Sequence, residues 1–359
     1  MSSPEARTEG AKSHETEVPS LWLRRDSLTD PRATRIAFVG AGNITTQHAN
    51  SLRAIPSVSL VGVCDVQSQS AKRFGTHFGI PSFKDPARMV EETIPDGVVI
   101  GIPPFAHGPA ELACVSRGVP FLVEKPISNS LAVAQTIERA VRGSRLITSV
   151  GYMNRYRKGV RRAREMLSTR SISVAQGTWA TLHRGGPEWL VRESLSGGQL
   201  LEQLTHLFDL LRYFCGEVRE VRCLESPPLA RTNRSNRTRD ATVVALRMNN
   251  GTLASVVGSR TVLLPKVIQL RLFGPEIKVE FSGWDFHSRI CLASQSGATC
   301  ISGERDIFRT EQMAFLTAIR SGNPSQIESD YSDALKTLRV GLAAKRSART
   351  GHTVVLSRN

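Results

Sequence analysis

An apolar run that leads directly into a glycine turn constrains the fold of this chain more than any other feature. The run is Ile36–Val39, and the turn contains Gly40 and Gly42. A strand, a G-x-G turn and a helix in this order are typical of a dinucleotide-binding unit, because Gly40 allows a tight turn and Gly42 lets backbone amides approach a pyrophosphate. The third small position is Thr45, and a glycine turn that binds no ligand is the alternative. The expected cofactor contacts here are Gly40, Gly42, Asn43 and Ile44.

A carboxylate at the end of the second predicted strand favours NAD over NADP. Asp65 follows the run Leu60–Cys64 and lies 23 residues after Gly42. A carboxylate at this position accepts hydrogen bonds from the adenosine ribose hydroxyls and repels a 2′-phosphate. Two alternatives stay open: Asp65 could cap the next helix, and Lys72 with Arg73 could reach a 2′-phosphate, which leaves NADP as the second choice of cofactor.

Strands and helices alternate through the first half of the chain. Short runs rich in valine and isoleucine suit strands buried on both faces of a parallel sheet, and they occur at 36–39, 58–64, 97–100, 121–123 and 146–150. Helical segments are expected between them at about 44–54, 67–78, 105–117 and 130–142. This alternation predicts a Rossmann doubly wound α/β domain over residues 34–151, preceded by a flexible polar extension over residues 1–33.

The pattern changes after Gly151. A basic helix is expected at 156–167, a strand at 172–182 and a longer helix at about 199–214. Strands then follow one another at 218–224, 240–248, 251–259, 265–273 and 276–281, with a hairpin turn at 249–251 and two helices at about 306–321 and 331–349 after them. Consecutive strands predict an α+β domain with a largely antiparallel open sheet over residues 152–359, which we interpret as the substrate-binding half.

Composition and charge narrow the class of protein. Apolar residues make up 40% of the 359 residues, which suits two folded domains, and no apolar run approaches the ~20 residues of a membrane span. The net charge of +15 comes from arginines that are densest at 155–164 and 231–239. We interpret these segments as the solvated face of a helix and a polar loop rather than a nucleic-acid surface. Because no apolar export region follows Arg24-Arg25 and the cysteines form no C-x-x-C pair, we expect a cytoplasmic protein with reduced thiols.

A charged pair marks the end of another predicted strand. Glu124 and Lys125 follow the run Phe121–Val123 and precede Pro126. The carboxyl end of a parallel strand faces the ligand crevice in a doubly wound fold. A lysine there offers a compact charge with three donors, which could bind the nicotinamide ribose and a substrate hydroxyl together. A surface lysine at a strand terminus is the alternative.

A glycine-led helix carries three titratable side chains at helical spacing. Glu202 and His206 are four residues apart and share one face of a continuous helix, and Asp209 follows three residues later. An imidazole suits alcohol oxidation, in which a hydroxyl loses its proton as hydride leaves. We expect a neighbouring Glu202 to raise the pKa of His206. A purely structural histidine and half of a metal site are the alternatives.

These segments together resemble the Gfo/Idh/MocA family, named for glucose–fructose oxidoreductase, inositol dehydrogenase and a rhizopine-catabolism protein. The resemblance runs from about residue 34 to about residue 345. Four matches carry it: the glycine turn with Asp65, the segment Ile102-Pro103-Pro104-Phe105-Ala106-His107, the tripeptide Glu124-Lys125-Pro126, and Gly-Gly-Gln-Leu-Leu-Glu202 continued to His206 and Asp209.

The resemblance implies roles for individual residues. It implies that Lys125 contacts both cofactor and substrate, that His206 is the general acid/base, and that Glu202 takes the family's aspartate position. It also implies a cis peptide bond before Pro126. The further implied cofactor contacts are Pro103, His107 and Glu124, and the implied substrate contacts are Lys125, Arg155, Glu202, His206 and Asp209. The departures from the family are Thr45, the Ile102-Pro103-Pro104 segment and the longer side chain of Glu202.

We therefore expect an NAD(P)-dependent dehydrogenase that moves hydride between nicotinamide and the hydroxyl or keto carbon of a sugar, polyol or sugar derivative. The alternatives are an enzyme of the same fold that uses NAD transiently to cleave a glycosidic bond and a non-catalytic dinucleotide-binding regulator. The net charge of +15, together with Arg155, Arg157 and Lys158, predicts a negatively charged substrate, for example one that bears a phosphate. The strand-rich second half predicts a homo-oligomer, a dimer or tetramer. We expect no metal, membrane or nucleic-acid partner.

Overall fold

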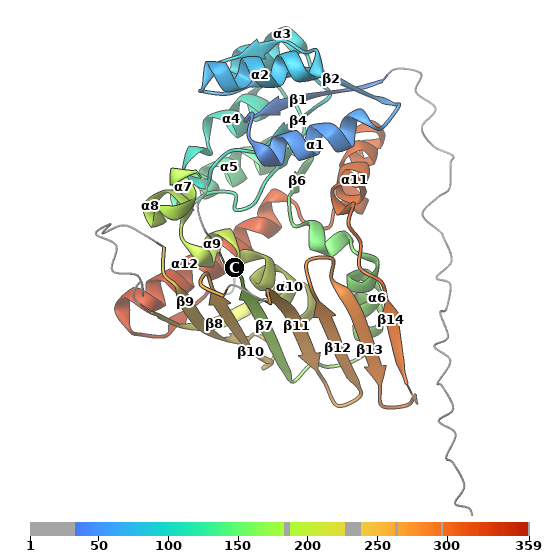
Figure 1. Ribbon diagram of the computed structural model, residues 1–359, viewed down its shortest axis with the longest axis vertical. Helices are drawn as coiled ribbons and strands as arrows, with labels where there is room; N and C mark the ends of the chain where they lie inside the picture. The colour runs from blue at the N-terminus through green and yellow to red at the C-terminus, as the bar shows by residue number, and fades with distance from the viewer. Residues whose placement is uncertain (1–32, 183–186, 227–237, 263–264, 296, 358–359) are drawn as a thin grey trace, which may run out of the picture. The chain divides into compact units, whose positions relative to one another are not determined.

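The computed structural model describes residues 33–182, 187–226, 238–262, 265–295 and 297–357. The predicted extension at 1–33 therefore lies outside the described residues except for Ala33, as do Arg24-Arg25 and most of the predicted basic loop at 231–239. None of the described helices is long and apolar enough to cross a membrane. The described strands form two β-sheets, which Figure 1 shows with their helices.

The first sheet has six strands in the order β3-β2-β1-β4-β5-β6, and all neighbouring pairs are parallel. This is the strand order of a doubly wound dinucleotide-binding fold. The five predicted strands are confirmed as β1 (Thr34–Val39), β2 (Val58–Cys64), β4 (Gly97–Ile100), β5 (Phe121–Val123) and β6 (Thr148–Val150). The remaining strand, β3 (Ser82–Phe83), has only two residues, which is too short to give a recognisable pattern.

Five α-helices connect these strands: α1 (Asn43–Arg53), α2 (Ser68–Phe78), α3 (Pro86–Thr93), α4 (Pro109–Ser116) and α5 (Leu131–Ser144). The helix α3 is an addition to the predicted set. It begins after Asp85, whose side chain accepts a hydrogen bond from the backbone amide of Arg88 at 2.8 Å. The helix predicted at 105–117 is divided, because the φ of 129° at Gly108 separates the 3₁₀ turn η1 (Pro104–Ala106) from α4.

The second sheet has nine strands in the order β14-β13-β12-β11-β7-β10-β9-β8-β15. Its strands are β7 (Val174–Ala180), β8 (Val218–Glu225), β9 (Ala241–Met248), β10 (Leu253–Ser259), β11 (Val267–Phe273), β12 (Ile277–Ser282), β13 (His287–Leu292), β14 (Ala298–Ile301) and β15 (Val354–Val355). Only β7 and β10 pair in parallel, so the predicted largely antiparallel sheet is confirmed. The predicted hairpin joins β9 and β10 through Gly251, whose φ is 93°.

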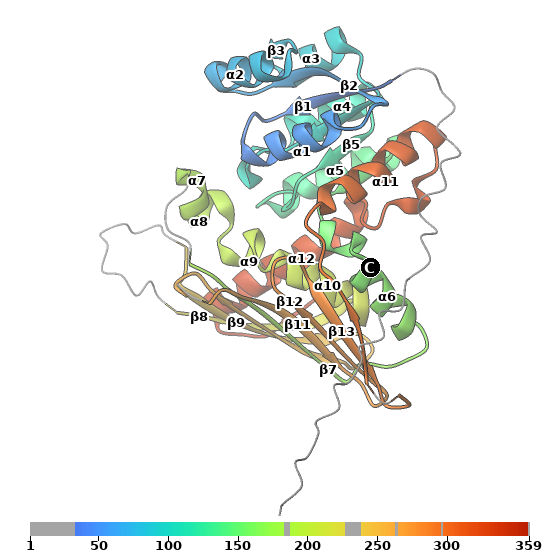
Figure 2. The same cartoon turned by 45° about the vertical axis from the view of Figure 1, so that its right-hand side comes forward.

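Helices cover one face of this second sheet, as Figure 2 shows. They include α6 (Lys158–Leu167), α10 (Thr205–Cys215) and α12 (Tyr331–Thr350), which share one apolar core with the inward positions of the strands. Burial alternates strictly along β9 and nearly so along β11, so every second side chain of β9 faces away from the helices. Two shorter helices, α7 (Glu188–Val191) and α8 (Glu193–Ser196), precede the segment that carries the candidate site.

The two C-terminal helices also pack on the first sheet. In α11 (Ile307–Ser321), Phe315 and Leu316 join the core on the α1 face of that sheet. In α12, Leu335 and Leu338 join the core on the opposite face, while Val340 joins the core of the second sheet. The chain therefore returns to its first half after β14, and α12 contributes to both cores before β15 joins the second sheet.

The basic run at 155–164 is not the solvated helix face that its composition predicts. Arg155 lies in a 3₁₀ turn, η2 (Met153–Tyr156), and Arg157 follows it, and these residues are only 4% and 1% exposed. Arg157 donates hydrogen bonds to the carbonyl oxygens of Trp284, Asp285 and Glu304. The prediction is therefore wrong for these two arginines, because their guanidinium groups are buried and bind carboxylate or carbonyl oxygens inside the protein.

Candidate active site

The glycine turn between β1 and α1 has the geometry that a pyrophosphate needs. Gly40 has a φ of +94°, and a Cβ on it would lie 2.2 Å from the carbonyl oxygen of Gly101, so only glycine fits. Gly42 precedes α1 and has open space around it, and no side chain caps the first amides of this helix. Asn43 is exposed and Ile44 is half-buried at the helix start. These residues fit an anionic ligand at the positive end of α1.

Thr45, which departs from the usual glycine, is accommodated by a glycine on the sheet. Thr45 is fully buried, and its hydroxyl donates a hydrogen bond to the carbonyl oxygen of Gly101 at 3.2 Å. A Cβ on Gly101 would lie 2.4 Å from the same hydroxyl oxygen. The close approach of α1 and β4 is thus kept, because the small residue at the contact is Gly101 after β4 instead of a glycine in α1.

Asp65 lies directly after β2 and holds the glycine turn in place. Its Oδ2 accepts a hydrogen bond from the backbone amide of Ala41 at 2.8 Å, and its Oδ1 accepts one from the amide of Gln67 at 2.7 Å. Each carboxylate oxygen can accept a second hydrogen bond, and Asp65 is only half-buried. The side chain is therefore available to the ribose hydroxyls that the sequence predicts, beside the turn that it stabilises.

Lys125, which follows β5, contacts Glu202 of the site predicted in the second half of the chain. Its Nζ donates a hydrogen bond to the backbone carbonyl oxygen of Glu202 at 2.9 Å and lies 3.7 Å from the Oε1 of the same residue. The peptide bond between Lys125 and Pro126 is cis, as the family resemblance implies. Among the described residues, the Oε2 of Glu202 is buried and has no hydrogen-bond partner.

The helix predicted at 199–214 is interrupted, so Glu202 and His206 do not share one continuous helix. The structure has α9 (Gln199–Glu202) and then α10 from Thr205. At the break, the amide of His206 donates to the carbonyl oxygen of Gln203 instead of that of Glu202. The carbonyl of Glu202, which a regular α-helix would use, is thereby free to accept the hydrogen bond from Lys125.

His206 contacts two aromatic rings. It stacks on Trp179 with ring centroids 5.4 Å apart and an interplanar angle of 13°, and it lies perpendicular to the ring of Tyr152 with centroids 6.3 Å apart. Burial, together with the positive charges of Lys125 and Arg157, lowers the pKa of His206 well below its ordinary value. The prediction that Glu202 raises this pKa is therefore wrong, and the imidazole is neutral at neutral pH. Its Nδ1 is buried without a hydrogen-bond partner among the described residues.

Two other histidines stabilise the strand and loop that the sequence analysis assigns to the cofactor. His48 bonds through Nε2 to the Oε1 of Glu124 at 2.9 Å, and its Nδ1 accepts a hydrogen bond from Gln312 at 2.8 Å. His107 bonds through Nδ1 to Glu111 at 2.5 Å, and both side chains are fully buried. Glu124 and His107 thus support the strand end and the turn, and Pro103 is half-buried before η1.

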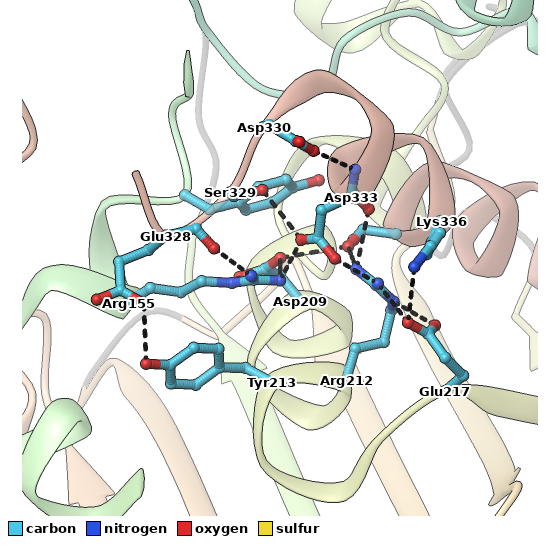
Figure 3. A network of polar contacts seen from close by, with 12 residues as sticks. Arg155, Asp209, Arg212, Tyr213, Glu217, Glu328, Ser329, Asp330, Asp333 and Lys336 are labelled. Atoms are coloured by element: carbon cyan, nitrogen blue, oxygen red, sulfur yellow. Dashed lines mark hydrogen bonds and ion pairs between the residues drawn. The ribbon is translucent and has the colours of Figure 1, made fainter. Parts of the chain in front are cut away.

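Arg155 and Asp209 pair with each other. The guanidinium of Arg155 donates two hydrogen bonds to the carboxylate of Asp209, at 2.8 and 2.6 Å, and also lies 2.7 Å from Asp333 (Figure 3). Arg212 pairs with Asp333 and with Glu217 in the same network. We therefore revise the predicted substrate contacts: Arg155 and Asp209 join η2, α10 and α12, and their charges are already paired.

Three residues that the sequence analysis does not single out also belong to this region. Trp179 stacks on His206. Gln199 begins α9, and Arg260 follows β10. The Oε1 of Gln199 and both terminal nitrogens of Arg260 are buried and have no hydrogen-bond partner among the described residues. A sequence signal exists for Arg260, because it continues the alternating buried positions of β10 and is the only charged residue among them. No three or more histidine, cysteine, aspartate or glutamate side chains in the described ranges are grouped to hold a metal ion.

Two family models match the chain. The model described as "Oxidoreductase family, NAD-binding Rossmann fold" matches residues 34–152, and the "GFO/IDH/MocA C-terminal domain" matches residues 160–280. Among characterised proteins, the chain is 25% identical to myo-inositol 2-dehydrogenase of Thermotoga maritima, with 90% of this chain and 98% of that protein covered. It is 26% identical to the NAD(+)-dependent scyllo-inositol 2-dehydrogenase of Bacillus subtilis, with 90% and 96% covered.

Solved structures show the same fold. Levoglucosan dehydrogenase in complex with NADH matches with a TM-score of 0.81 and 18% identity, over 91% of this chain and 100% of that one. GenD2 from gentamicin A biosynthesis, in complex with NAD, matches with a TM-score of 0.77 and 20% identity, over 91% and 97%. At these identities the likeness concerns the fold of the two halves.

Proposed function

Because the chain belongs to the GFO/IDH/MocA family of oxidoreductases, whose first domain is an NAD-binding Rossmann fold, we propose that it oxidises a hydroxyl-bearing carbon of a sugar, polyol or sugar derivative. The names of its relatives, inositol and levoglucosan dehydrogenases, support this substrate class. The observation that supports the proposed site most directly is the hydrogen bond from Lys125 to Glu202, with the neutral His206 close enough for the charge of Lys125 to lower its pKa.

The residues of the first half, 34–151, fit the cofactor. Gly40, Gly42 and the free amides at Asn43 and Ile44 would hold the pyrophosphate, and Asp65 would hold the adenosine ribose. When bound, NAD supplies the nicotinamide carbon that accepts hydride. Lys125, at the end of β5, would bind the nicotinamide ribose at the edge of the sheet where ligands bind in such folds.

Proton transfer is assigned to His206. Oxidation of an alcohol requires a base that takes the hydroxyl proton, and a buried imidazole with a lowered pKa is already neutral and able to accept it. The stacked Trp179 and the perpendicular ring of Tyr152 would orient the imidazole. The resulting imidazolium would keep its proton until product leaves or the reverse reaction returns it.

Charge stabilisation is assigned to Lys125. Its ammonium has three donors, and the carbonyl of Glu202 uses one of them. The other donors can stabilise the negative charge that develops on the substrate oxygen as its proton leaves. Glu202 and Gln199 each present a buried oxygen that has no hydrogen-bond partner in the described part of the chain, and these oxygens would accept hydrogen bonds from further substrate hydroxyls. The residues beyond 151 would thus orient the substrate.

A substrate screen tests this function. The purified chain is incubated with NAD and, one at a time, with myo-inositol, scyllo-inositol, levoglucosan and glucose 6-phosphate, and NADH is followed by absorbance. We expect net NADH with at least one of them, and no NADH when Lys125 and His206 are both replaced. Cleavage of a glycosidic bond without net NADH would instead support the enzyme that uses NAD transiently, and binding of NAD with no conversion of any sugar would contradict the proposed function.

A further inference from the structure

The side chain of a buried arginine, Arg260, lies beside the proposed substrate site. Arg260 is 6% exposed, and both of its terminal nitrogens are buried with no hydrogen-bond partner among the described residues. A buried guanidinium with unused donors is costly, because the four N–H groups on its terminal nitrogens lose water and gain nothing in return. Buried polar groups in folded proteins are nearly always satisfied, so this exception needs an explanation such as a ligand.

The sheet register places Arg260 on the same face as the proposed catalytic histidine. Gly258 of β10 pairs with Trp179 of β7, and both residues are buried on the helix-covered face. Because side chains alternate along a strand, Arg260 returns to that face two residues later, about 7 Å further along the strand direction. Trp179 in turn stacks on His206. Arg260 therefore lies on the same face of the sheet as Trp179, two residues beyond the position that pairs with it.

The same face carries the unpartnered oxygens of α9. A Cβ placed on Gly258 would lie 2.7 Å from the Oε1 of Gln199, so α9 lies directly over the end of β10. Burial lowers the pKa of Arg260, and the negative charges of Glu202 and Asp240 partly oppose this shift. Neither carboxylate accepts a hydrogen bond from the terminal nitrogens of Arg260. The region thus contains acceptors for hydroxyl groups and one unused guanidinium.

We propose that Arg260 binds an oxyanion on the substrate, a carboxylate or a phosphate, and that the enzyme therefore prefers acidic sugars or sugar phosphates to neutral polyols. The planar guanidinium presents two parallel donors that match the paired oxygens of either group. The hydroxyls of the same substrate would meet Glu202 and Gln199, while its oxyanion would meet Arg260 and its reacting oxygen Lys125. The inference rests on the proposed function, because it names the class of its substrate.

This assignment replaces the residues from which the sequence predicts a negatively charged substrate. Arg155 is paired with Asp209, and Arg157 is hydrogen-bonded to carbonyl oxygens, so neither has donors to offer. The overall charge of the chain carries no information about the site. The unused donors of Arg260 point to an anionic substrate independently of that charge.

The test compares matched neutral and anionic substrates on wild type, two Arg260 variants and one control variant. Wild type, Arg260→Met and Arg260→Lys are assayed with NAD and glucose, glucuronate or glucose 6-phosphate, and KM and kcat are determined separately. Arg139→Met is the control, because Arg139 is exposed on α5 and bonds only within its own helix. We expect wild type to favour an anionic sugar, and Arg260→Met to reduce that preference by roughly 10²-fold, mainly through KM. Arg260→Lys should keep part of the preference, since it keeps the charge but loses the paired donors.

Binding measurements separate failure of this inference from failure of the proposed function. With NADH bound, glucuronate or glucose 6-phosphate should raise the Tm of wild type and of Arg139→Met, but much less that of Arg260→Met, even if no probe is oxidised. Without ligand, Arg260→Met should have a Tm equal to or above that of wild type, because an unpaired buried charge has been removed. An equal loss of kcat/KM for neutral and anionic sugars, or a marked fall in Tm without ligand, would overturn the assignment.

Discussion

The ammonium of Lys125 donates a hydrogen bond to the backbone carbonyl oxygen of Glu202, at 2.9 Å. The donor lies at the end of a strand of the first sheet, and the acceptor lies at the break between two helices that cover the second. The carbonyl is available only because the helix is interrupted after Glu202. The hydrogen bond that positions Lys125 therefore depends on this interruption.

Replacing this lysine should impair both binding and turnover. In Lys125→Met the side chain keeps its length but loses the charge and all three donors, so we expect kcat/KM to fall by ~10²-fold or more and NAD to bind more weakly. Kd for NAD by calorimetry and steady-state kinetics measure the two effects. Lys336→Met is a suitable control, because Lys336 is half-exposed on α12 and pairs with Glu217. Unchanged NAD affinity would remove Lys125 from the cofactor site.

Replacing His206 should affect turnover and leave the dinucleotide site intact. His206→Asn keeps a polar side chain on the α10 turn but has no group that accepts a proton near neutral pH, so kcat should fall by ~10²-fold or more. NAD affinity should stay within about twofold, because the glycine turn and Asp65 are in the other half of the structure. Melting temperature, NAD affinity and kcat are measured on the same sample. A lower Tm with kcat unchanged would assign His206 a packing role on Trp179 only.

The lowered pKa of His206 predicts an unusual pH dependence. In the free enzyme the imidazole stays neutral until the pH is well below its ordinary 6.5, so the acid limb of kcat/KM for alcohol oxidation should lie below that pH. Stability follows the same sign: the unfolded chain takes up a proton below about pH 6.5 and the folded chain does not, so acid destabilises the folded state. The free energy of unfolding should therefore fall less in His206→Asn than in wild type between pH 7 and pH 5. An acid limb at or above pH 6.5 would contradict this assignment.

The order of strands and helices follows closely from local patterns, whereas the environment of the site does not. Continuous apolar runs such as Val98–Ile100 indicate strands buried on both faces, and those residues are fully or almost fully buried. The break after Glu202 leaves no trace in the sequence, because leucines at 200, 201, 204 and 207 continue a helical period across it. The interruption is visible only in the hydrogen bonds at the break, where Leu204 bonds back five residues to Gln199.

Charge pairing over long separations is the other part that the sequence cannot supply. Arg155 and Asp209 are 54 residues apart, and nothing local distinguishes Arg155 from an arginine in a substrate site. The direction of the His206 pKa shift likewise depends first on burial and then on Lys125 and Arg157, which the fold brings near it, rather than on Glu202. Candidate site residues could thus be named from motifs, but their electrostatics required the tertiary structure.

Asp65 should make the protein prefer NAD to NADP. Its carboxylate would repel the 2′-phosphate of NADP, so we expect NADH to bind at least about tenfold more tightly than NADPH. Asp65→Asn should reduce this preference while keeping an oxygen that can accept the hydrogen bond from the amide of Ala41. Fluorescence titration of both reduced cofactors measures the ratio, and Asp85→Asn, which alters only the cap of α3, is the control. Tighter binding of NADPH by wild type would contradict the prediction and indicate that Lys72 and Arg73 reach the phosphate.

The outward face of the second sheet should mediate self-association. Its exposed apolar side chains include Val174, Leu224, Val243, Leu253 and Val257, which lie on four strands that are neighbours in the sheet order. No described helix covers this face, and exposed apolar patches of this kind commonly mark protein interfaces. We expect light scattering at micromolar concentration to give a multiple of the 39.3 kDa chain mass.

Val243→Lys combined with Val257→Lys should shift the protein toward the monomer, because desolvating two ammonium groups disfavours association. Val66→Lys, at a position 85% exposed on the first half, should leave the mass unchanged. A wild-type mass equal to that of one chain would rule out the predicted oligomer.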